Sequence, residues 1–96
     1  MTTVEVRETF IRVYGHSGYA PIGHDIVCAA ISTLTEATYR YLVATKNMVN
    51  QKESNGVYII NLEALNEQGR AIINSFIDMV QELINQYPKN VEWRKL

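Results

Sequence analysis

The sequence predicts a small α+β domain in which two helices cover one face of a mixed or antiparallel sheet. Its 96 residues provide for one modest core, so residues 1–96 are expected to form a single domain. Two long stretches carry apolar residues at intervals of three and four, which is typical of amphipathic helices. Short β-branched and aromatic stretches flank them. The expected order is therefore strand–strand–helix–strand–strand–helix–strand.

The N-terminal part predicts a hairpin and then a helix. Residues 10–14 have the composition of a strand, and residues 2–7 are its expected partner, with a tight turn near Glu8. Asp25 is a good N-cap for a helix that runs to about Lys46. Its expected stripe is Val27, Ala30, Ile31, Leu34, Thr38, Tyr41 and Leu42. The first turn is small and apolar on every side, so we expect the helix start to be buried.

The C-terminal part predicts a second hairpin, a helix and a last strand. The dipeptide at residues 55–56, Asn-Gly, is the strongest turn signal in the chain, with strands expected at residues 49–53 and 57–61. A second helix is expected from its N-cap Asn66 to Tyr87, where Pro88 ends it. Residues 91–95 alternate as an edge strand would.

The single cysteine, Cys28, is the most informative candidate for chemistry. It falls in the first turn of the expected helix, where the dipole and free N–H groups favour a thiolate and can hold an oxyanion. His16 stands at the other end of a loop rich in glycine and is the candidate base, with Asp25 as its candidate orienter. This arrangement is typical of a cysteine nucleophile.

A purely structural interpretation of the same residues stays open at this point. A lone cysteine among apolar residues is commonly a small buried hydrophobe. His16 and His24 then are solvated loop residues, and Asp25 is only a cap. Ser17 is a weak nucleophile candidate because it lacks the Gly-x-Ser-x-Gly context.

Composition and spacing argue against several function classes. A net charge of −1 offers no basic surface for nucleic acid or for an anionic membrane. No apolar run reaches the length of a transmembrane helix, and we expect no signal peptide. The His and Cys spacing matches no standard zinc pattern, so neither metal nor cofactor is expected. One cysteine forms no internal disulfide, which favours a reducing cytoplasm.

Two segments of the chain resemble the ribosomal-processing cysteine protease family, Prp. They are Gly-His-Ser-Gly-Tyr-Ala at residues 15–20 and Gly-His-Asp-Ile-Val-Cys-Ala-Ala-Ile-Ser at residues 23–32. The resemblance implies Cys28 as nucleophile, His16 as general base, and peptide hydrolysis through an acyl-enzyme. Gly15, Gly18, Gly23, Asp25 and Ser32 then are supporting residues of the motif.

The resemblance also implies a substrate and an assembly. Family members trim a short N-terminal extension, after a pair of phenylalanines, from large-subunit ribosomal protein number twenty-seven. Proteins of this type occur in phages too, so a phage structural precursor is a second candidate substrate. The family forms homodimers, and its loop between histidine and cysteine closes on substrate. In this chain that loop comprises Ser17, Gly18, Tyr19, Ala20, Pro21, Ile22, Gly23 and His24.

A second hypothesis is a non-catalytic homodimeric module that binds a ribosomal or phage assembly partner. The small size of the chain, its half-buried terminal strand and its aromatic residues favour this alternative. It predicts an inert Cys28.

Overall fold

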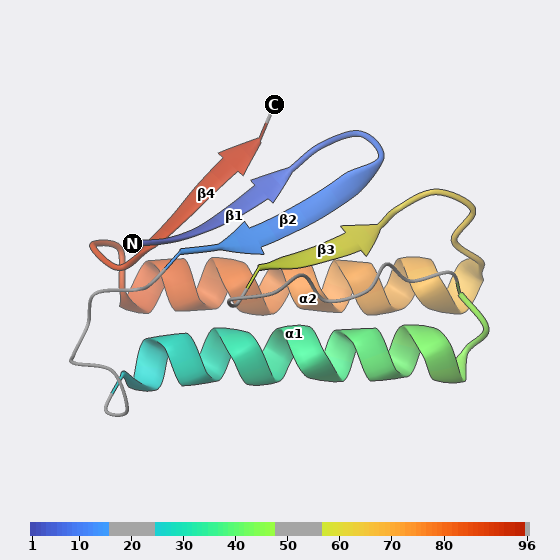
Figure 1. Ribbon diagram of the computed structural model, residues 1–96, viewed down its shortest axis with the longest axis horizontal. Helices are drawn as coiled ribbons and strands as arrows, with labels where there is room; N and C mark the ends of the chain where they lie inside the picture. The colour runs from blue at the N-terminus through green and yellow to red at the C-terminus, as the bar shows by residue number, and fades with distance from the viewer. Residues whose placement is uncertain (16–24, 48–56, 96) are drawn as a thin grey trace.

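The computed structural model describes residues 1–15, 25–47 and 57–95 of the chain. Two N-terminal strands are followed by a helix, a strand, a second helix and a last strand (Figure 1). The strands are β1 (Thr2–Val6), β2 (Phe10–Tyr14), β3 (Tyr58–Asn61) and β4 (Val91–Lys95), and the helices are α1 (Ile26–Ala44) and α2 (Glu67–Gln86). The expected α+β class and element order are thereby confirmed. The expected strand at residues 49–53 lies outside the described residues.

The four strands form one mixed sheet in the order β3-β2-β1-β4. Strand β2 pairs antiparallel with β1, where Val13 lies opposite Val4, and with β3, where Ile11 lies opposite Ile60. Strand β4 runs parallel to β1 and places Trp93 beside Val4. The parallel pair is possible because the long path through both helices separates these strands in the chain.

Both helices lie on the same side of the sheet (Figure 1). Alternate residues of every strand face the helices, as the two-residue period of a strand requires. The resulting core comprises Val4, Ile11, Val13, Tyr58, Ile60 and Val91 from the strands with Val27, Ile31, Tyr39, Leu42, Ile73, Phe76 and Val80 from the helices. One continuous apolar layer therefore holds the domain together.

The buried stripe of α1 differs from the expected one at its C-terminal half. Tyr41 is 63% exposed, whereas Tyr39 is only 9% exposed. The helix also buries Thr35 and Thr38, whose hydroxyls donate to the carbonyls one turn back, at Ile31 and Leu34, over 2.7 and 2.8 Å. These bonds satisfy the hydroxyls without a tertiary partner. The prediction that Tyr41 belongs to the core stripe was wrong.

Tyr39 contacts the outer edge of β3. Its hydroxyl donates to the carbonyl of Ile59 and accepts from the Ile59 N–H, at 3.2 Å. The Leu62 N–H donates to the Thr9 carbonyl, and along an antiparallel pair the hydrogen-bonded residues alternate with residues that do not bond to the partner strand. In this register the N–H and carbonyl of Ile59 therefore point away from β2. In the described sheet β3 lies at one end, and Tyr39 therefore occupies backbone groups that would otherwise attract another strand.

The end of α1 is tied to the start of α2 through Asn47. Its side chain accepts from the Asn66 N–H at 2.9 Å and donates to Asn66 Oδ1 at 3.0 Å. Asn66 Oδ1 also accepts from the Gly69 N–H at 2.8 Å, which makes Asn66 the N-cap that the sequence predicts. A Cβ at Gly69 would lie 2.4 Å from Asn47 Oδ1, so a larger residue there would displace the Asn47 side chain from its hydrogen bonds with Asn66.

Candidate active site

Cys28 lies in the first turn of α1, and Asp25 caps that turn. The Asp25 Oδ1 atom accepts from the N–H groups of Val27 and Cys28, at 3.1 and 2.9 Å. The backbone of Asp25 is extended, as an N-cap residue requires. The predicted cap is confirmed, and it fixes where the helix begins and hence where the cysteine stands.

The same cap engages the first amides of α1. The N–H groups of Val27 and Cys28 already donate to Asp25, and the Ala29 N–H donates to the Asp25 carbonyl at 3.1 Å. These three amides therefore have acceptors within the turn itself. The reason is that one carboxylate oxygen accepts two of the orphan donors of the helix.

The helix start is less buried than the sequence predicts. Val27 alone is fully buried in the first turn, whereas Cys28 is half-buried and Ile26 is 56% exposed. A helix on one face of a sheet buries only the side that faces the sheet. Cys28 therefore lies at the margin between core and surface.

Gly15 directly follows β2 in the chain. Its φ is +92°, and a Cβ there would lie 2.4 Å from the carbonyl oxygen of Met1. Both the backbone conformation and the close approach of Met1 require glycine. A side chain at position 15 would therefore be strained and would collide with the first residue of the chain.

The remaining loop candidates lie outside the described residues. They are His16, Ser17, Gly18, Tyr19, Ala20, Pro21, Ile22, Gly23 and His24.

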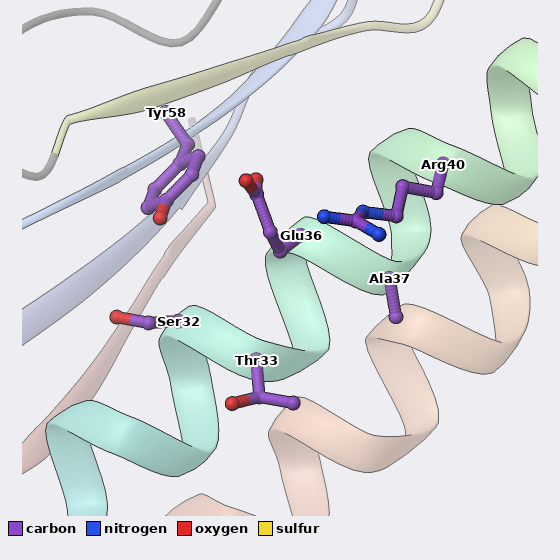
Figure 2. A pocket seen from close by; sticks show the side chains of 6 residues that line it. All are labelled: Ser32, Thr33, Glu36, Ala37, Arg40 and Tyr58. Carbon is purple, nitrogen blue, oxygen red and sulfur yellow. The ribbon is translucent and has the colours of Figure 1, made fainter.

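A hollow of about 440 Å³ lies beside α1 on the C-terminal side of Cys28. Figure 2 shows the side chains that line it, which come from α1 and from β3. They belong to Ser32, Thr33, Glu36, Ala37, Arg40 and Tyr58. Ser32, a residue of the sequence motif, lines this hollow and stands about one turn beyond Cys28.

Sequence reasoning did not single out Glu36, Arg40 and Tyr58, which line this hollow. A signal was present for the first two, because Cys28, Ser32, Glu36 and Arg40 recur every four residues and so form one ridge of the helix. The sequence carried no such signal for Tyr58, because the position of this residue opposite α1 depends on how β3 joins the sheet.

Within residues 1–15, 25–47 and 57–95, no group of three His, Cys, Asp or Glu side chains is arranged to hold a metal ion. In the same part of the chain no helix has the length and apolar character that crossing a membrane requires.

Comparison with known proteins identifies a family whose sequence model matches this chain. Residues 1–92 match the sequence model of the family described as cysteine protease Prp. No curated protein matches the chain.

Solved structures share the fold over nearly the whole chain. The ribosomal processing protease Prp from S. aureus, solved with a covalently linked product peptide, is similar at a TM-score of 0.85 and 21% identity, with 100% of each chain covered. The structure of S. aureus Prp with a substrate peptide is similar at a TM-score of 0.76 and 18% identity, and the match covers 99% of this chain and 97% of that one. A Streptococcus mutans protein is similar at a TM-score of 0.73 and 24% identity, and the match covers 99% of this chain and 91% of that one.

Proposed function

The chain belongs to the cysteine protease Prp family, and we propose that it is an endopeptidase with Cys28 as nucleophile and His16 as general base. One structural observation carries the assignment of the nucleophile. The only cysteine of the chain stands half-buried in the capped first turn of α1, one turn before the first residue of α1 that lines the hollow. Membership of a protease family also decides against a non-catalytic interaction module.

The proposed reaction proceeds through a thioester. His16 accepts the thiol proton, and Cys28 Sγ attacks the carbonyl carbon of the scissile bond. The proton passes to the leaving amine as the C–N bond breaks, and the N-terminal part of the substrate stays on the sulfur. Water, deprotonated by the same histidine, then hydrolyses the thioester and restores the thiol. The covalently linked product peptide on S. aureus Prp supports this course by likeness.

The proposed substrate is a precursor protein that carries a short N-terminal extension. The S. aureus protein of the same fold is described as a ribosomal processing protease. By likeness, the favoured substrate is large-subunit ribosomal protein number twenty-seven, cut after a pair of phenylalanines. A phage structural precursor is the second candidate for the same chemistry.

We further propose that the enzyme acts as a homodimer in the cytoplasm. A reducing compartment keeps the single thiol in the reduced form that the mechanism needs. Light scattering of the purified protein tests the assembly, with a mass of twice 11.0 kDa expected. A monomer with full peptidase activity would refute the dimer as the active form.

Mass spectrometry of peptide cleavage tests the function. A peptide that spans the extension and the Phe-Phe pair is incubated with the wild type and with the Cys28→Ala and His16→Ala variants. The wild type should produce two fragments, and each variant should lose at least about a thousandfold in rate. Cleavage that survives in folded Cys28→Ala protein would overturn the assignment of the nucleophile.

Alkylation provides a second, independent measurement. Because Cys28 is the only cysteine, iodoacetamide should add one carboxamidomethyl group and abolish cleavage in proportion to the labelled fraction. Full activity in fully labelled protein would contradict a nucleophilic role for the thiol.

A further inference from the structure

One ridge of α1 leads from Cys28 into the hollow. Ser32, Glu36 and Arg40 succeed Cys28 at steps of four residues, and all three line the hollow. Each step advances about 6 Å along a helix. A peptide whose scissile bond lies at Cys28 therefore meets these three side chains in turn if it extends along α1.

Two of these side chains carry opposite charges without pairing with each other. Glu36 precedes Arg40 by four residues, which is the favourable order for an ion pair on a helix. Nevertheless, neither side chain takes part in an ion pair among the residues that the structure describes. Figure 2 shows the Glu36 carboxylate directed toward Tyr58 of β3, across the hollow. The carboxylate is thus presented to an occupant of the hollow.

Burial decides whether the charge of Glu36 or that of Arg40 discriminates more strongly between substrate side chains. Glu36 is half-buried and faces the ring of Tyr58, which is only 5% exposed, whereas Arg40 is exposed. Water and salt screen an exposed charge more than a partly buried one. The methyl group of Ala37 and the Tyr58 ring also offer apolar surface to the aliphatic stem of a lysine or arginine.

We propose that Glu36 is a specificity-determining residue that selects a basic side chain in the peptide substrate. This inference rests on the proposed function. Glu36 follows Cys28 by eight residues, or about 12 Å along the helix. An extended peptide rises about 3.3 Å per residue. The selected side chain therefore belongs to the third or fourth residue from the scissile bond.

Cleavage of matched peptides tests the proposal. In peptides with one common cleavage sequence, Lys or Gln is placed at the third or fourth residue on either side of the scissile bond. The wild type should prefer Lys in at least one of these positions by about three- to tenfold in kcat/KM. Glu36→Gln should bring that ratio to about one, and Glu36→Lys should reverse it in favour of a peptide with Glu there.

A carboxylate elsewhere provides the control. Glu82 is exposed on α2, away from the residues that line the hollow, so Glu82→Gln should keep the wild-type preference. Absence of any preference for Lys in the wild type would overturn the proposal, as would a preference that survives in Glu36→Gln.

Binding to the Cys28→Ala variant separates this proposal from the proposed function. Fluorescence anisotropy of the labelled Lys and Gln peptides needs no cleavage and measures the selection directly. A tighter Lys peptide whose advantage disappears in Cys28→Ala/Glu36→Gln supports the role of Glu36, even if the wild type cuts neither peptide. Equal affinities for the two peptides in Cys28→Ala would refute it.

Discussion

Replacing Tyr39 by phenylalanine removes one oxygen atom from the contact between α1 and β3 and leaves the ring in place. That oxygen donates to the carbonyl of Ile59 and accepts from its N–H. The aromatic volume is unchanged, so the substitution creates no cavity of the kind that truncation of a core side chain leaves. Any loss of stability in Tyr39→Phe therefore reports the interactions of the hydroxyl, among them the two hydrogen bonds to Ile59.

The expected loss is about 1–3 kcal/mol. The hydroxyl belongs to a side chain that is 9% exposed, and its removal leaves a half-buried donor and acceptor of Ile59 without that partner. A buried polar group that loses its hydrogen-bond partner costs about 1–3 kcal/mol in desolvation. Because water partly reaches the strand edge, the combined cost for the N–H and the carbonyl of Ile59 stays within that range. For a domain of this size the melting temperature should fall by about 4–24 °C.

Urea denaturation followed by circular dichroism measures the loss. Tyr41→Phe is the matched control, because Tyr41 lies on the same helix, is 63% exposed and should change stability by less than about 0.5 kcal/mol. The released backbone groups of β3 should also increase self-association of Tyr39→Phe. A Tyr39→Phe variant as stable as Tyr41→Phe would refute the assigned role of the hydroxyl.

Three further substitutions test positions around the site and the helix junction. Asp25→Ala should lower the free energy of unfolding by about 1 kcal/mol, whereas Asp25→Ser should restore most of it, and equal urea midpoints for both would contradict capping. Gly15→Ala should destabilise by at least about 1 kcal/mol and slow peptide cleavage, since its Cβ meets the Met1 carbonyl, and unchanged melting and kcat/KM would argue against the conflict. Gly69→Ala should cost about 1–3 kcal/mol through its clash with Asn47, and the cost should shrink in the background of Asn47→Ala, as a double-mutant cycle would measure.

Much of the fold was predictable because the signals are local. Both N-caps, Asp25 and Asn66, were expected from residue type and position, and the structure confirms both. The strands at residues 10–14 and 91–95 have the predicted bounds. Such features depend on residues within one or two turns of each other, and composition and spacing report those contacts directly.

The errors concern the direction in which side chains face. Tyr41 was expected in the core and Tyr39 takes that place, because the edge of β3 lies on the Tyr39 side of α1. Ile26 was expected to be buried and is exposed, because the sheet covers only one side of the first turn. Helical periodicity predicts the angles between side chains around the helix axis. Which of these side chains is buried depends on the neighbouring elements, and these come from other parts of the chain.

The sequence by itself determined the class of fold, the capped start of α1 and the presence of the only cysteine in its first turn. Through its resemblance to a protease family it also led to the nucleophile that we propose. Only the tertiary structure decided that β4 runs parallel to β1 and that Tyr58 of β3 faces Glu36 across a hollow. Capping and periodicity act within a few residues, whereas this hollow exists because the packing of the core brings distant segments together.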